Sequence, residues 1–214
     1  MITLALAKGR TVNGTIQLLQ KAGYYFEDFH ESSRKLVFYD STEQIQLIFV
    51  KAIDVPTYVE KGAADLGIVG KDNILETAAD VYEMLDLMEG KCQFVIAGKE
   101  RQVLEKKRLV VASKYPHIAE AHFSKMGIQA ETIKLNGSVE LAPLIGMADV
   151  IVDIVETGRT LKENGLIVLE ELEEISTRLI TNKASFATKT TKITAFIRQI
   201  QDALEDQDEN FISK

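Results

Sequence analysis

The chain of 214 residues is poor in several residue types, and each scarcity narrows what the protein can be. Cys92 is the only cysteine, so no disulfide can form within the chain, which favours a reducing compartment. The 3 prolines and 13 glycines leave little room for a long linker. No run of about 18 apolar residues exists, so no segment is expected to span a membrane. The N-terminus does not have the pattern of a signal peptide either, and we expect a soluble, cytoplasmic protein.

Positive charge is also scarce. Lys and Arg number 25 against 32 Asp and Glu, which gives a formal net charge of −7. A nucleic-acid partner is therefore disfavoured, because a phosphate backbone is bound by basic surfaces. Residues 52–90 hold two basic residues against nine acids, whereas the first 51 residues hold six basic ones. A small anionic ligand is thus expected to find its partners in the N-terminal quarter, among Lys8, Arg10, Lys21, Arg34, Lys35 and Lys51.

Short apolar runs alternate with longer periodic segments, which is typical of an α/β protein. A first group of strands is predicted at 2–7, 35–39, 46–51 and 64–69, and a second group at 92–98, 108–113, 131–135, 148–154 and 166–172. Helices are predicted at 15–22, 54–61, 118–126, 137–145 and 191–204. The last helix carries an apolar stripe that needs a partner, and we expect it to return to the first of two lobes.

Several local features follow from the same patterns. Asp54 and Ser138 are expected to cap helices, and Pro56 suits a first helical turn. Cys92 begins an apolar run and is expected to be a buried structural thiol. The acidic stretch 170–174 is interpreted as a solvated face or turn. The three histidines, His30, His117 and His122, are interpreted as surface or packing residues.

The most informative stretch is 150–161, in which an apolar strand leads to an acidic residue and then to Thr-Gly-x-Thr. Such a turn can direct several backbone N–H groups and two hydroxyls at one phosphate. Gly158 permits a close approach of the backbone, and Asp153 stands where a carboxylate could bind ribose hydroxyls or a metal. The turn alone also fits an ordinary strand-to-helix connection with a threonine cap. Our interpretation is a loop that holds a phosphate of a phosphorylated ribose, formed by Glu156, Thr157, Gly158, Arg159 and Thr160.

A wider signature around this loop resembles that of the ATP phosphoribosyltransferase family. It comprises Glu140, Gly146, Ala148, Ile151, Asp153, Ile154, Thr157, Gly158, Thr160 and Leu161. Residues 4–10, 33–36 and 54–72 are similar to other blocks of the same family, and all blocks follow the family order over nearly the whole chain.

The resemblance implies a fold and a reaction. The fold is a two-lobed α/β structure like a type II periplasmic binding protein, with the active site in the cleft between the lobes. We assign residues 1–90 and 178–214 to lobe I and residues 91–177 to lobe II. The reaction transfers the phosphoribosyl group of phosphoribosyl pyrophosphate to N1 of ATP and releases pyrophosphate, as the first step of histidine biosynthesis.

The resemblance also implies roles for individual residues. Arg34 and Arg10 are the expected catalytic residues, because a guanidinium suits the charge that develops on the leaving pyrophosphate. Mg²⁺ is expected with the pyrophosphate substrate, held mostly by phosphate oxygens and water, and no metal site of the protein's own is predicted. Lys51 stands where other members carry Arg. The residues expected to bind ATP or pyrophosphate are Lys8, Gly9, Arg10, Lys51 and Asp72, and those for phosphoribosyl pyrophosphate are Glu140, Asp153, Glu156, Thr157, Gly158, Arg159 and Thr160.

The chain ends after one amphipathic helix, so it resembles the short form of the family. Short-form subunits work with a separate regulatory subunit related to histidyl-tRNA synthetase, and self-association to a dimer is expected as well. Two other readings stay open: a phosphoribosyltransferase that acts on a free purine base, and a non-catalytic two-lobed binding or sensor domain. The second shares the architecture but does not explain the phosphate loop or the basic residues near the N-terminus.

Overall fold

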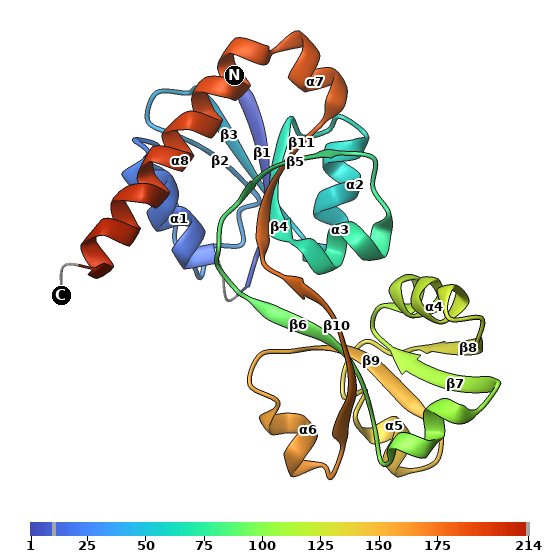
Figure 1. Cartoon of the computed structure of the whole chain (residues 1–214). Helices are drawn as coiled ribbons and strands as arrows, with labels where there is room; N and C mark the ends of the chain where they lie inside the picture. The colour runs from blue at the N-terminus through green and yellow to red at the C-terminus, as the bar shows by residue number, and fades with distance from the viewer. Residues whose placement is uncertain (10–11, 213–214) are drawn as a thin grey trace. The chain divides into compact units, whose positions relative to one another are not determined.

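The computed structural model describes residues 1–9 and 12–212, which form two compact units (Figure 1). The first unit comprises Met1–Gly90 with Ser176–Lys214, and the second comprises Lys91–Ile175. No helix among the described residues is long and apolar enough to cross a membrane.

One mixed sheet organises the described part of the first unit, with its strands in the order β2-β3-β1-β4-β11-β5. Strands β1, β3 and β4 are mutually parallel, whereas β2 runs antiparallel to β3, and β11 runs antiparallel to both β4 and β5. The strands are β1 (Ile2–Ala7), β2 (Val37–Tyr39), β3 (Ile45–Val50), β4 (Leu66–Gly70), β5 (Tyr82–Asp86) and β11 (Thr177–Thr181). The helices are α1 (Val12–Lys21), α2 (Val55–Glu60), α3 (Lys71–Thr77), α7 (Lys183–Thr188) and α8 (Thr190–Ile212), with a short 3-10 turn η1 (Ala52–Asp54).

Helices cover both faces of this sheet, which explains why the residues of the central strand β1 are apolar except for Thr3. Leu4 and Leu6 lie in the core beneath α1 and α8, while Ala5 lies in a smaller cluster beneath α2. All three are at most 2% exposed. Alternate side chains of a strand point to opposite faces, so a strand covered on both sides is apolar on both. The exception, Thr3, donates its hydroxyl to Oε1 of Gln46 at 3.1 Å.

The second unit is built on a sheet whose described strands run in the order β10-β6-β9-β7-β8 (Figure 1). Strands β7, β8 and β9 are mutually parallel, and β6 runs antiparallel to both β9 and β10. The strands are β6 (Cys92–Gly98), β7 (Arg108–Ser113), β8 (Gln129–Lys134), β9 (Val150–Val155) and β10 (Ile167–Ile175). Helices α4 (Pro116–Lys125), α5 (Leu141–Leu144) and α6 (Arg159–Glu163) and the 3-10 turn η2 (Arg101–Glu105) connect them.

The structure corrects several expectations from the sequence. The helix predicted at 137–145 shrinks to α5, because Ser138 has a φ of 51°, which an α-helix does not accommodate. The N-cap of α5 is Glu140 instead of the predicted Ser138, and neither Glu140 nor Asp54 makes a side-chain cap hydrogen bond. Cys92 is partly exposed at the start of β6 instead of buried. The acidic stretch 170–174 belongs to β10, which bulges against β6 there, so of the two expected forms it is a partly solvated face and not a turn.

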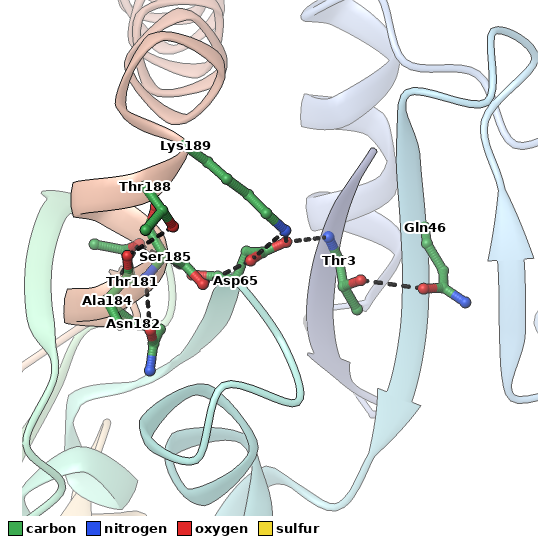
Figure 2. A network of polar contacts seen from close by, with 9 residues as sticks. All are labelled: Thr3, Gln46, Asp65, Thr181, Asn182, Ala184, Ser185, Thr188 and Lys189. Carbon is green, nitrogen blue, oxygen red and sulfur yellow. Dashed lines mark hydrogen bonds and ion pairs between the residues drawn. The ribbon is translucent and has the colours of Figure 1, made fainter.

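The C-terminal segment is fastened to the first unit by one buried carboxylate (Figure 2). Lys189 lies 2.9 and 2.8 Å from the two oxygens of Asp65, and the Ser185 hydroxyl donates to the same carboxylate at 2.6 Å. The backbone N–H of Thr3 donates to it at 2.9 Å. Beyond this network, Ile193, Phe196 and Ile200 of α8 enter the core of the unit at 0% exposure.

Asp65 is only 5% exposed, so the pKa of its carboxyl depends on both its burial and its hydrogen-bond partners. Burial alone would raise the pKa of Asp65, but the hydrogen bonds from Lys189, Ser185 and Thr3 outweigh it and lower the pKa below its ordinary value. A carboxylate with a lowered pKa stabilises the fold at neutral pH, and that contribution is lost as the pH falls through the folded-state pKa.

We expect Lys189→Ala to lower the free energy of unfolding by about 2 kcal/mol, because it leaves a buried carboxylate without its cation. Lys61→Ala is the matched control, since Lys61 pairs at 3.1 Å with Glu60 and its side chain is 71% exposed. Its effect should stay within about 0.5 kcal/mol. Urea unfolding at neutral pH measures both variants, and equal losses would contradict the anchoring role of Lys189.

Candidate functional site

Two of the basic residues predicted from the sequence, Lys8 and Lys51, lie at the carboxyl ends of parallel strands in the first unit. Ala7 pairs with Val50, and Leu6 with Ile68, so β1, β3 and β4 end at the same edge of the sheet. Lys8 and Gly9 follow β1, Lys51 follows β3, and Asp72 lies two residues beyond β4. The chain passes from β3 to β4 across β1, and ligands of open α/β sheets bind at such a reversal, outside the carboxyl ends.

Arg34 reaches the same edge by a different route. Because β2 runs antiparallel to β3, the residues before β2 lie beyond the carboxyl end of β3, and the N–H of Phe49 donates to the Leu36 carbonyl at 2.8 Å. Arg34 is exposed on this loop. The loop is tied to β1 by Lys8, whose Nζ donates to the Ser33 carbonyl at 2.6 Å and lies 5.5 Å from the centroid of the Phe49 ring.

A pocket of about 300 Å³ opens between the end of β1 and this loop. Its lining includes both a cation and a carboxylate, and the Glu31 carboxylate also accepts from Asn13 at 3.2 Å. Arg10, predicted to be catalytic, lies outside the described residues. The described residues that line the pocket are Lys8, Gly9, Val12, Phe29 and Glu31.

Lys51 and Asp72 differ in how accessible they are. Lys51 is exposed and precedes the turn η1, so its ammonium is available to a ligand. Asp72 is 8% exposed in the first turn of α3, where its carboxylate folds over Gly70. A Cβ added to Gly70 would lie 2.2 Å from Oδ1 of Asp72. The structure therefore places Asp72 at the edge of the site but packs it against its own backbone.

The predicted phosphate loop follows β9 in the second unit. Gly158 has a φ of 70° and a ψ of 2°, so the turn uses the left-handed conformation that glycine adopts without strain. Glu156, Thr157 and Thr160 are exposed, and Leu161, at 4% exposure, fastens the start of α6 to the core. Since α6 has only 5 residues, its dipole is small, and the exposed hydroxyls and turn N–H groups are what the loop offers to an anion.

The Arg159 side chain forms an ion pair within α6 and does not act as a free anion-binding group in the structure. Its Nε donates to Oε1 of Glu163 at 2.7 Å along the exposed side of α6. The pair is exposed on both sides, at 82% and 61%, so it is weak and can open for a ligand.

Asp153 and Glu140 lie at the same edge of the second sheet as the loop. Asp153 is half-buried near the carboxyl end of β9, where its Oδ1 accepts from the N–H of Ile154 at 2.9 Å. Glu140 is half-buried before α5, in the segment that follows the parallel strand β8. No group of three or more His, Cys, Asp or Glu suited to hold a metal occurs among the described residues.

Glu89 is an acid at the carboxyl edge of the first sheet that no sequence motif indicates. Glu89 follows β5, which runs parallel to β4, and its Oε1 would lie 3.2 Å from a Cβ on Gly14 of α1. Burial raises the pKa of Glu89 above its ordinary value. The pairing of β5 in the sheet brings this carboxylate to the start of α1. Because β5 is not evident in the sequence, this position could not be predicted.

Two α/β units, each with an open sheet and polar residues at its carboxyl edge, define a two-lobed protein of the periplasmic-binding type. The periplasmic VFT2 domain of BvgS from Bordetella pertussis has this fold, with a TM-score of 0.57 at 14% identity over 96% of this chain and 90% of that domain. At this identity the likeness concerns the fold alone.

Closer relatives identify the family. The profile of the ATP phosphoribosyltransferase family matches residues 51–202. An ATP phosphoribosyltransferase of Oceanobacillus iheyensis is 57% identical over 93% of this chain and 96% of its own length, and one of Caldanaerobacter subterraneus is 49% identical over 95% and 98%. The ATP phosphoribosyl transferase (HisG:HisZ) complex from Thermotoga maritima contains a chain with a TM-score of 0.87 and 34% identity, covering 96% of this chain and 100% of that one. The chain belongs to the ATP phosphoribosyltransferase family.

The close packing of the Asp72 carboxylate over Gly70 can be tested by substitution. Gly70→Ala is expected to lower the free energy of unfolding by about 2 kcal/mol, because the new methyl must displace the Asp72 carboxylate. In an Asp72→Ala background the same substitution should cost less than about 1 kcal/mol, and the coupling is read from a double-mutant cycle. Additive losses would show that the contact at 2.2 Å does not govern this turn.

Proposed function

We propose that this chain is the catalytic subunit of an ATP phosphoribosyltransferase. It transfers the phosphoribosyl group of phosphoribosyl pyrophosphate to N1 of ATP and releases pyrophosphate, the first step of histidine biosynthesis. The observation that carries the proposal is the turn after β9, where the left-handed Gly158 stands between the exposed hydroxyls of Thr157 and Thr160. The family profile covers this turn, and the close relatives extend the likeness over more than nine-tenths of the chain.

In the proposed reaction, N1 of adenine attacks C1 of the ribose as the bond from C1 to the pyrophosphate oxygen breaks. Positive charge develops on the ribose ring and negative charge on the leaving pyrophosphate. Arg34, Lys8 and Lys51 are described cations at the first edge, and we assign Arg34 to the developing negative charge. Arg10 and Lys51 are assigned to phosphates of ATP or pyrophosphate.

The turn after β9 is assigned to the phosphate of the ribose. Asp153 and Glu140 have carboxylate oxygens that accept hydrogen bonds from ribose hydroxyls. Mg²⁺ enters with the pyrophosphate substrate and takes most of its ligands from phosphate oxygens and water.

The complex from Thermotoga maritima joins HisG to HisZ, and we propose an equivalent partner for this chain. That partner is a regulatory subunit related to histidyl-tRNA synthetase. The proposal predicts that the partner raises turnover without contributing the residues assigned above.

The purified chain should convert ATP and phosphoribosyl pyrophosphate to phosphoribosyl-ATP in the presence of Mg²⁺, and faster with the regulatory subunit. Chromatography of the nucleotides measures the product. No product under either condition would overturn the proposal. Product from a free purine base in place of ATP would support the alternative phosphoribosyltransferase, and tight ligand binding without turnover would support a sensor domain.

Arg34→Ala is expected to lower kcat by about 100-fold, which is the usual loss of one transition-state donor. Lys35→Ala is the matched control on the same loop, because Lys35 already lies 3.4 Å from Asp28 and 5.1 Å from the centroid of the Phe38 ring. Its effect on kcat should stay below about fivefold. Wild-type turnover of the Arg34 variant would remove this residue from the catalytic assignment.

Gly158→Ala and Gly127→Ala separate ligand binding from backbone strain. Both glycines have a φ of 70° and little around them, so both variants should lose about 1 kcal/mol of stability. Gly127 lies between α4 and β8, at the opposite edge of the second sheet. Only Gly158→Ala should raise KM for phosphoribosyl pyrophosphate, by about tenfold, because the strained alanine shifts the turn N–H groups away from the charged phosphate. Equal KM values in steady-state assays would contradict the assignment of the loop.

A further inference from the structure

The chain contains three Asn-Gly dipeptides, at residues 13–14, 136–137 and 164–165. In this dipeptide the backbone nitrogen of Gly can attack the carboxamide carbon of Asn, because a glycine presents no Cβ to block the approach and its backbone turns freely. The attack needs an unhindered side chain and a Gly N–H that is not already engaged. The local structure therefore decides which of the three dipeptides can react.

Local structure restrains two of the dipeptides against this attack. Asn13 belongs to α1, whose helical backbone fixes both residues, and its Nδ2 donates to Glu31 at 3.2 Å. The Nδ2 of Asn164 donates to the Thr160 carbonyl at 2.8 Å. The attacking atom is engaged as well, because the Gly165 N–H donates to the Lys162 carbonyl at 3.1 Å.

The third dipeptide, Asn136–Gly137, lies between β8 and α5 and is free of these restraints. Asn136, Gly137 and Ser138 are all exposed. Within residues 1–9 and 12–212 no hydrogen bond engages the Asn136 carboxamide or the Gly137 N–H. A Cβ added to Gly137 would meet nothing within 4 Å, so the surroundings leave room for the two groups to approach.

We propose that Asn136–Gly137 is a site of spontaneous deamidation through a succinimide. The Gly137 nitrogen forms a bond to Cγ of Asn136, the bond from Cγ to Nδ2 breaks, and Nδ2 leaves as ammonia with the proton of the Gly137 amide. Water then opens the ring at one of its two carbonyls and yields aspartate or isoaspartate. No oxidant or reductant takes part, and the product carries one new carboxylate.

The new charge falls at the edge of the second sheet that carries the phosphate loop. β8 lies two strands from β9, about 10 Å away at the usual strand spacing, and Glu140 follows four residues later. A carboxylate at that distance from a phosphate anion should weaken its binding by about threefold after screening by salt. Isoaspartate also lengthens the main chain by one carbon just before Ser138. This consequence rests on the proposed function, whereas the modification itself does not.

Peptide mass spectrometry of the full chain after incubation at mildly alkaline pH tests the modification. Asn136 should convert at least about tenfold faster than Asn13 or Asn164, since those must first lose one or two hydrogen bonds. Gly137→Ala, which the open space tolerates, should suppress the conversion by hindering the attacking nitrogen. Equal rates at the three sites, or faster loss at Asn164, would overturn the proposal.

Kinetics of fresh and aged enzyme test the consequence. Wild-type KM for phosphoribosyl pyrophosphate should rise with the fraction converted, and Asn136→Asp should show about a threefold rise without ageing. Aged Gly137→Ala should keep its initial KM. Conversion without any change in KM would overturn the consequence and leave the site. Fresh enzyme without any turnover would instead count against the proposed function, which the mass measurement does not depend on.

Discussion

The carboxylate of Asp65, just before β4, connects its own segment to β1 and to the C-terminal segment, both of which are far from it in sequence. It accepts from the backbone of β1 at Thr3, from Ser185 of α7 and from Lys189 just before α8. Its own backbone carbonyl accepts from the Asn182 N–H at 3.0 Å. An ionised group at 5% exposure is tolerated only because it is fully hydrogen-bonded, and it fixes where the returning C-terminal segment meets the sheet.

This anchor lies at the amino end of β4, and the candidate site lies at the carboxyl end of the same strand. The register that Asp65 helps to set therefore also sets where Lys8, Lys51 and Asp72 emerge. A slip of one residue would turn the buried side chains of β1 to the other face. The stabilising network thus lies at one edge of the sheet and the polar groups of the site lie at the other. This separation allows the site to keep exposed cations.

The sequence predicted the α/β class and the parallel strands well, because buried parallel strands are mostly apolar runs such as Ile2–Ala7 and Val150–Val155, each with a single polar residue. It missed β5 and β11, whose stabilisation comes from pairing with each other and with β4. It also extended a helix through Ser138, since a positive φ in a non-glycine residue has no signal in residue type.

The candidate site shows the same contrast. The turn at Thr157–Thr160 was predictable because glycine and hydroxyl residues in a fixed spacing follow an apolar strand. The packing of Asp72 over Gly70 was not, since it depends on a side-chain conformation. The proximity of Glu89 to Gly14 was not predictable either, because it depends on which strands are neighbours. The backbone geometry of the turn was therefore predictable from the sequence, whereas the accessibility of each group was not.

The central claim is that the turn after β9 binds the phosphate of the ribose substrate. Backbone amide NMR during titration with phosphoribosyl pyrophosphate and Mg²⁺ tests it directly. The account predicts saturable shifts of the Thr157, Gly158 and Thr160 amides at the concentration that half-saturates the enzyme. Amides of this turn that remain unmoved at saturation, while those elsewhere shift, would contradict it.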